Sequence, residues 1–195
     1  MRFITCSGKN PKAGTTMIQR KSSKELLIES VLELLSEYPI EKITVSKIAE
    51  RCSLSKRTFY YHFSDKYDLA NKAYYYQMCK YCEENKGTLT LHGFLCHIAG
   101  FINDHHDYFK HLAQYKGQNN IADFNIIHMR ETFEQIIRES FHDEITDNIS
   151  NIITFYIVGM THYVTEIIAG SSRIPPEEIV ELFEQCVPVP LQKYL

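Results

Sequence analysis

The chain has 195 residues, of which 44% are hydrophobic and 23% are charged, and its formal net charge is −3 at pH 7. That length suits one domain or two small ones with a real core, and the acidic average taken alone argues against a nucleic-acid binder. The charge, however, is divided unevenly along the chain. Residues 1–66 carry twelve Lys and Arg against seven Asp and Glu, whereas residues 67–195 carry nine against seventeen. A basic head on an acidic body is compatible with binding a polyanion at one end.

Membrane and secreted classes are not supported. No stretch of 18 apolar residues is free of charge, and the nearest candidate, residues 152–169, is interrupted by Thr, His and Glu, so it predicts a buried helix. The N-terminus lacks the apolar core of a signal peptide. The six cysteines, at positions 6, 52, 79, 82, 96 and 186, show no disulfide-framework spacing. We expect a cytoplasmic protein with reduced thiols and no membrane segment.

The first elements in chain order are an arm and a helix. Residues 1–22 contain scattered Gly, Pro, Ser and Thr with little periodicity, which predicts a flexible basic arm. From Ser23 the apolar residues repeat with the spacing of an amphipathic helix. Pro39 ends that helix, because the residue before proline is disfavoured in the helical conformation.

Three further helix starts are marked by capping residues. Thr44 is placed to cap a short helix, Ser55 a second one over residues 56–63, and Asp65 a long helix that runs to about Asn85. Apolar stripes predict helices in the remaining chain as well, and no strand pattern is present. The later predicted helices lie at about residues 91–102, 108–115, 124–141, 145–169 and 176–192. We therefore predict an all-α fold.

Residues 44–63 have the pattern of a helix-turn-helix, in which two short helices are joined by a tight turn and the second is basic. Helix N-termini and hydroxyl groups favour phosphates, and Arg57 and Lys56 have the reach to contact base edges. Because the apolar residues of this segment face inward, the polar ones are left for DNA. The predicted DNA-binding residues are Thr44, Ser46, Ser55, Lys56, Arg57, Thr58, Tyr60, Tyr61 and His62.

These residues resemble the TetR/AcrR family of transcriptional regulators. The shared positions are Thr44, Ile48-Ala49, Leu54-Ser55, Thr58 to Phe63, Lys66 and Leu69. The resemblance covers about residues 24–70 and departs at Ser53 and Arg57, where glycine is common in the family, and at Tyr67, where an acid is common. It implies groove contacts for Arg57 and Thr58, and phosphate contacts for Lys56, Tyr60, Tyr61 and Lys66.

The resemblance implies three regions: the arm, a DNA-binding domain at residues 23–68, and a ligand-binding and dimerisation domain at residues 69–195. It implies a homodimer that binds a double-stranded operator, and we expect a repressor controlled by a small-molecule effector, without a cofactor. The wide apolar stripe of the last long helix favours burial against a second copy. The predicted dimer residues are Ile153, Ile157, Met160, Val164, Ile168, Ile179 and Phe183.

Aromatic and His residues of the second region are candidates for lining an effector pocket, although they serve equally well as core. They are His97, Phe101, His105, Tyr108, Phe124, His128, Phe155 and Tyr163. Two alternatives stay open. The second region could bind a protein partner, as in an activator or a nucleoid-associated factor, or Cys79 and Cys82 could form a thiol or metal sensor. An enzyme is not expected, since the sequence lacks a glycine-rich phosphate loop, a nucleophile elbow and a zinc-protease pair.

Overall fold

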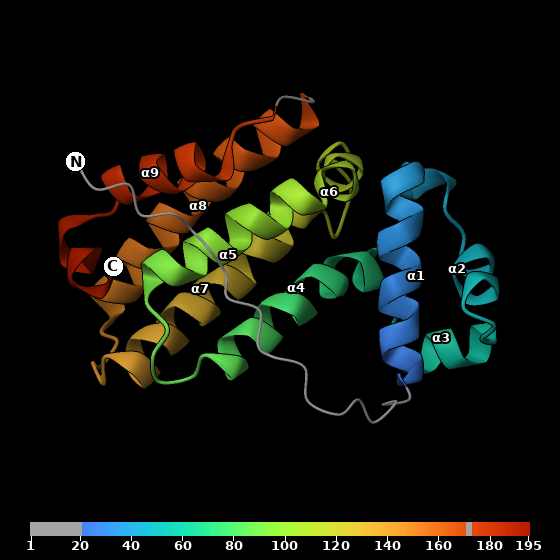
Figure 1. The fold of residues 1–195 in the computed structure, drawn as a ribbon, viewed down its shortest axis with the longest axis horizontal. Helices are drawn as coiled ribbons and strands as arrows, with labels where there is room; N and C mark the ends of the chain where they lie inside the picture. The colour runs from blue at the N-terminus through green and yellow to red at the C-terminus, as the bar shows by residue number, and fades with distance from the viewer. Residues whose placement is uncertain (1–20, 171–172) are drawn as a thin grey trace, which may run out of the picture.

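The computed structural model describes residues 21–170 and 173–195, and within these ranges the chain forms helices without a strand (Figure 1). The fold is all-α, as the sequence predicts. Most of the expected N-terminal arm, residues 1–20, lies outside the described residues.

The N-terminal helices form a small head. They are α1 (Ser23–Glu37), the 3-10 turn η1 (Ile40–Lys42), α2 (Val45–Arg51) and α3 (Lys56–His62). Ser22 and Glu25 form a capping box at the start of α1, because the Ser22 side chain accepts from the Glu25 N–H and the Glu25 carboxylate accepts from the Ser22 N–H. The helix ends at Glu37, two residues before Pro39.

The second region forms a larger helical body. It contains α4 (Lys66–Glu84), α5 (Leu91–Asp104), α6 (His106–Ala113), α7 (Ile121–Ser140), α8 (Asp147–Ala169), α9 (Pro176–Gln185) and the 3-10 helix η2 (Val189–Tyr194). The helix expected over residues 176–192 is therefore shorter than predicted. It ends at Gln185, and Pro188 and Pro190 allow only a 3-10 continuation, because proline cannot donate the backbone hydrogen bonds of an α-helix.

Helix α1 joins the head to the body, since it packs against α2 and α3 on one side and against α4 and α6 on the other (Figure 1). Within the body, α7 packs along α8 and α5 packs along α9. Leu27, Val31, Leu34 and Leu35 of α1 are fully buried between the two parts. One continuous apolar core therefore supports the position of the head.

Helix α8 has an unusual surface for the longest helix of the body. Of the described helices, α8 alone has the length and the apolar composition needed to cross a membrane. Core helices of soluble proteins also meet these two criteria. Only 33% of its most apolar window is buried within the chain. The large apolar side chains of α8 that the chain leaves exposed are Phe155 and Tyr163, at 82% and 43%.

Candidate nucleic-acid interface

Helices α2 and α3 form a helix-turn-helix whose caps are those expected from the sequence. Thr44 Oγ1 accepts from the Lys47 N–H at 3.2 Å, and Ser55 Oγ accepts from the Thr58 N–H at 3.1 Å. The turn is closed by the Leu54 N–H, which donates to the Ala49 carbonyl at 2.8 Å. Ser53 has φ 56°, a left-handed conformation that serine adopts less readily than glycine. The sequence departs from the usual glycine here, but the turn is retained.

The inner side of this unit is apolar, as predicted. Ile48, Ala49, Phe59 and Phe63 are buried, and Leu54 is partly buried. The rings of Phe59 and Phe63 lie 6.0 Å apart between centroids. This packing fixes the rotation of α3 about its axis, and therefore fixes which of its side chains face solvent.

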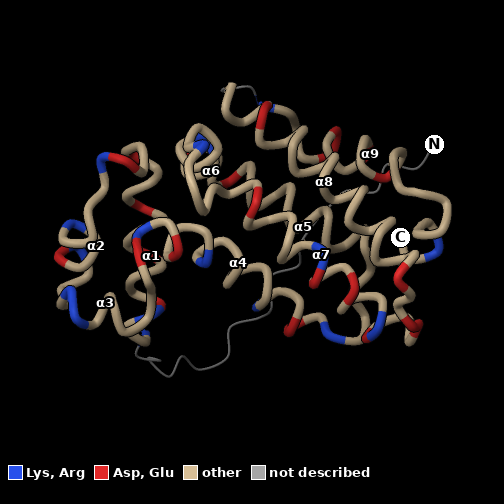
Figure 2. The backbone as a smooth tube through the Cα atoms, turned by 180° about the vertical axis from the view of Figure 1, so that it is seen from behind, with Lys and Arg blue, Asp and Glu red and all other residues tan. Residues whose placement is uncertain are grey.

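The outer side of α3 carries cations and tyrosines. Lys56 and Arg57 are exposed, and among the described residues no ion pair neutralises either side chain. Tyr60 and Tyr61 are 58% and 84% exposed although they are large aromatic residues. Figure 2 shows Lys and Arg on α2 and α3 at one end of the molecule, remote from α8 and α9. A face with free cations and phenol hydroxyls has the chemistry of a phosphate-binding surface.

His62 lies at the end of α3, where it connects two helices. Its Nε2 is 2.8 Å from Ser23 Oγ, so a hydrogen bond joins the end of α3 to the start of α1. The ring also stacks edge-on against Tyr61, with 4.9 Å between centroids. His62 therefore helps to orient Tyr61, whereas the direct DNA contact expected of His62 stays a prediction.

Lys66 has a different position from that expected. Its ammonium group donates to the carbonyl oxygens of Ile40 at 2.8 Å, Ile43 at 2.9 Å and Glu41 at 3.3 Å. Burial lowers the pKa of this amine. An ammonium group has three N–H donors, and three carbonyl groups use them. The structure therefore assigns Lys66 to closing the η1 turn against α4, in place of the predicted phosphate contact.

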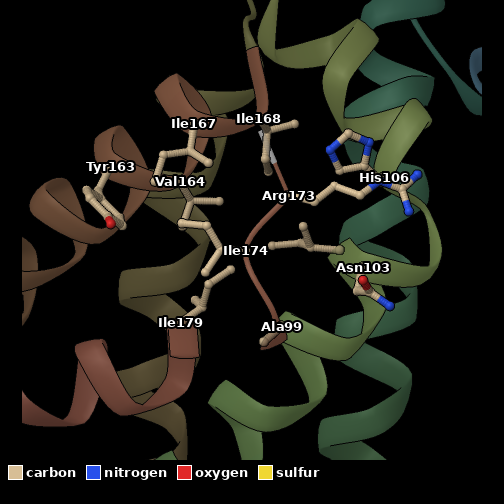
Figure 3. Close-up of a pocket in the computed structure, with 11 residues that line it drawn as sticks. Ala99, Asn103, His106, Tyr163, Val164, Ile167, Ile168, Arg173, Ile174 and Ile179 are labelled. Atoms are coloured by element: carbon tan, nitrogen blue, oxygen red, sulfur yellow. The ribbon is translucent and has the colours of Figure 1, made fainter. Parts of the chain in front are cut away.

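The body contains a cleft between α5, α8 and the segment that leads into α9 (Figure 3). Its walls are apolar, and include Ile102, Val164 and Ile174. Figure 3 shows Arg173 and His106 close to one another on one side of the cleft. An adjoining hollow of about 50 Å³ extends toward Thr161 and Thr165 and has room for a few water molecules.

The predicted pocket residues are dispersed. Tyr163 lines the cleft. Tyr108 is buried in the core and its hydroxyl donates to the Ala70 carbonyl, while Phe155 is 82% exposed. Both predictions are therefore corrected. Tyr108 lies in the core with a backbone partner for its hydroxyl, and the Phe155 ring faces outward, so neither lines the cleft.

The other candidates lie in aromatic pairs, of which one is stacked and two are tilted. His97 stacks on Tyr81 with ring centroids 3.7 Å apart, and burial lowers the pKa of His97. The remaining pairs are Phe101 with His105, at 4.3 Å, and Phe124 with His128, at 4.2 Å. The polar cleft residues Asn103, His106 and Arg173 were not predicted, because they come from separate segments that only the fold brings together.

The predicted dimer residues divide between core and cleft. Ile153, Ile157 and Ile168 are buried within the chain, and Ile179 and Phe183 are each only 7% exposed. Ile153 and Ile157 lie in the core, whereas Ile168 and Ile179 also line the cleft, and Ile179 and Phe183 line the adjoining hollow. The contact of these five residues with a second copy stays a prediction.

The other two predicted dimer residues, Met160 and Val164, line the adjoining hollow as well. The exposed side of α8 carries Phe155, Gly159 and Tyr163, which we call the outer stripe. These residues are spaced four apart and so share one helix face.

The cysteine pair of α4 is poorly placed for a sensor. Burial raises the pKa of the Cys82 thiol to about 12, which leaves little thiolate at neutral pH. In the described part of the chain, no three His, Cys, Asp or Glu side chains are grouped to hold a metal ion.

Comparisons with known proteins agree with this architecture. The family model described as "Bacterial regulatory proteins, tetR family" matches residues 27–73, and the model described as "Transcriptional regulator C-terminal region" matches residues 89–188. No curated protein matches the chain.

Two solved structures share the fold. A structure described as "Dihydroxyacetone kinase operon activator DhaS" is 13% identical with a TM-score of 0.65, covering 88% of this chain and 97% of its own. A tetR-family transcriptional regulator from Streptomyces coelicolor is 15% identical with a TM-score of 0.55, covering 83% and 77%. At these identities the likeness concerns the fold alone.

Proposed function

Because the chain belongs to the tetR family of bacterial regulatory proteins, we propose that it is a homodimeric repressor of the cytoplasm that releases its operator when a small effector binds. A DNA-binding transcriptional regulator, and not an enzyme, is what the family assignment establishes. The dimer, the direction of regulation and the effector are the proposed parts.

The observation that carries the proposal is the outer side of α3. Lys56 and Arg57 lie in its first turn, where the helix dipole also favours phosphate, and Tyr60 and Tyr61 extend the same polar surface. A recognition helix enters the major groove with its N-terminal residues leading, and a guanidinium group there reads guanine with two hydrogen bonds. Arg57 therefore has the position and chemistry of a base-reading residue.

The test is operator binding by an Arg57→Ala variant. We expect a loss of about 1–3 kcal/mol of specific binding and a relaxed preference at one base pair of each half-site. Fluorescence anisotropy with the operator and with point-mutated operators would measure both. Arg138→Ala is the matched control, because Arg138 is an exposed arginine of α7 that pairs with Glu134 at 3.0 Å. Unchanged operator affinity and specificity of the Arg57→Ala variant would contradict the proposed reading face.

The outer stripe supports a second copy as partner. Phe155 and Tyr163 are exposed, and a Cβ at Gly159 would meet no atom of this chain within 4 Å. The glycine is thus not required by packing inside the chain, but it leaves room for another helix to approach closely. An interface of two-fold symmetry presents the same patch twice, so an apolar stripe complements itself.

A repressor is the simplest outcome of this arrangement. A dimer that occupies a promoter through two heads blocks polymerase by occupancy alone, without a further surface that contacts polymerase. A promoter-reporter strain tests this directly: deletion of the regulator should raise reporter expression. A fall on deletion would identify an activator.

The cleft supports a small effector that is largely apolar with a polar or anionic end. Its walls are aliphatic, while Asn103, His106 and Arg173 supply polar groups at one side. A compound that binds this cleft better in one spacing of the two heads shifts the population toward that spacing. Operator release by short-chain carboxylic acids, compared between the wild type and Arg173→Ala, tests the polar end. Equal release from both proteins would remove Arg173 from the site.

A further inference from the structure

Three titratable side chains meet where α5 packs along α9. Cys96 Sγ lies 3.5 Å from His92 Nε2, and both residues belong to α5, one turn apart. The other ring nitrogen, His92 Nδ1, is bonded to the carboxylate of Glu184 on α9. All three side chains are at least partly exposed, so small reagents reach them from solvent.

These contacts favour one tautomer of the His92 ring. An ionised carboxylate only accepts hydrogen bonds, so the hydrogen of the neutral imidazole is on Nδ1, facing Glu184. The lone pair of Nε2 then faces the sulfur of Cys96. A thiol next to such a lone pair can transfer its proton to the ring, and the resulting imidazolium is stabilised by the carboxylate behind it.

The other partly buried thiols have different surroundings. Burial raises the pKa of Cys52, whose Sγ donates to the carbonyls of Ile48 and Ala49. Burial also raises the pKa of Cys82 to about 12. Tyr81 also lies close enough to Cys96 to interact with it electrostatically. Burial raises the pKa of Tyr81 as well, so this phenol stays neutral. His92 is a base that faces the Cys96 thiol.

We propose that Cys96 is a nucleophilic thiol that captures soft carbon electrophiles, namely α,β-unsaturated carbonyl compounds, with His92 as its proton acceptor and Glu184 as the residue that positions the ring. The sulfur forms a bond to the β-carbon as the C=C π bond breaks. The electron pair passes to the α-carbon, which takes up the proton held by His92 Nε2. The step is an addition, so no group leaves and nothing is oxidised or reduced.

The test uses N-ethylmaleimide on the full-length protein without DNA, so its result is independent of the proposed regulation. Modification at each cysteine is followed over time by peptide mass spectrometry. Trypsin separates Cys79 from Cys82 at Lys80. At pH 7 we expect Cys96 to react at least about tenfold faster than the exposed Cys79 and Cys186, because its thiolate fraction is larger. Cys82, partly buried like Cys96, should remain the slow internal control.

Two variants separate reactivity from simple exposure. His92→Asn should slow Cys96 about tenfold and move its rate–pH profile up toward that of an ordinary thiol, with a pKa of about 8.5. Glu184→Gln keeps an acceptor oxygen for Nδ1 but removes the charge, so its profile should move part of the way.

The proposal is overturned if Cys96 reacts no faster than Cys79 and Cys186, or if His92→Asn keeps the wild-type rate and profile. A wild-type profile in Glu184→Gln would overturn the role of Glu184. Loss of folding in either variant would be evident from rapid modification of Cys82, and the remaining variant would then decide.

Discussion

Lys66 and Lys56 are both lysines of the head, only ten residues apart, but their ammonium groups have different environments. Lys66 Nζ is surrounded by three backbone carbonyls, whereas Lys56 is exposed at the first turn of α3. Removing a charged donor from partly buried acceptors leaves the acceptors unsatisfied. Removing an exposed cation costs little in folding but weakens binding to a polyanion.

We therefore expect Lys66→Met to lower the free energy of unfolding by about 1–3 kcal/mol, and Lys56→Met to leave it within roughly 0.5 kcal/mol of wild type. Urea denaturation followed by circular dichroism measures both. Operator affinity should fall in the Lys56 variant. A Lys66 variant with wild-type stability would show that the three carbonyls are satisfied without it.

His97 gives the body a specific sensitivity to acid. Among the residues that the structure describes, none forms a hydrogen bond with its buried Nε2, and burial lowers its pKa below the ordinary value of about 6.5. The unfolded chain then binds a proton more readily than the folded chain, so the stability is present above about pH 6.5 and is lost as the pH falls through the folded pKa.

We expect His97→Phe, which retains a ring to stack on Tyr81, to lose less stability than wild type between pH 7 and pH 5. The measurement is the shift in Tm at several pH values. Parallel curves for the two proteins would indicate that His97 does not contribute to the acid loss.

At the scale of helices, local signals were predicted well and the choice of neighbours was not. Ser55 and Asp65 cap helices where the sequence places them, because a cap needs only a side chain and the next three residues. Periodicity assigns the stripe of α8 to one partner surface, but in the fold Ile153 is buried inside the chain and Phe155 is exposed on its outside. Sequence periodicity shows that both faces are apolar, and only the position of α7 decides which one is already covered. For the same reason, the carbonyl partners of Lys66, more than twenty residues away, could not be inferred.

The outer stripe predicts that α8 is the element on which assembly depends. Phe155→Glu introduces a charge at a side chain that is 82% exposed in the single chain, so the fold of the monomer should be unaffected. Buried in a symmetric interface, two such charges are costly. We expect the dimer dissociation constant to rise at least tenfold by analytical ultracentrifugation, and operator affinity to fall with it.

Ile127→Glu is the matched control, since Ile127 is a large apolar residue that is 54% exposed on α7, outside the outer stripe. It should leave the dimer intact. Equal dissociation constants for the Phe155 and Ile127 variants would place the interface elsewhere.

At the scale of the whole molecule, the uneven charge distribution determines how the protein approaches DNA. The first 66 residues are net basic and the remainder net acidic, so the duplex attracts one end and repels the other. Phosphate contacts made by the head release counterions, which makes affinity depend on salt. Cations of the body should not contribute to that dependence.

Lys56→Met removes one predicted phosphate contact from each bound head. For each contact removed, we expect the slope of log affinity against log salt concentration to decrease in magnitude by about one. Lys116→Met should leave the slope unchanged, because Lys116 pairs with Glu166 on the body at 2.8 Å. Anisotropy titrations between 50 and 200 mM salt distinguish the two. A reduced slope for the Lys116 variant would mean that the body also contacts the duplex.

Helix α6 lies between the cleft proposed for the effector and α1, the helix that carries the DNA-binding head. His106, its first residue, lines the cleft, while His111 Nδ1 lies 2.6 Å from the Leu35 carbonyl of α1. The two residues are five positions apart, about 7.5 Å along the helix axis. Under the proposed effector response, we expect a shift at the cleft to pass through this short helix to α1, the helix that carries the head. Helix α6 is thus a single short link that contacts the cleft through His106 and α1 through His111.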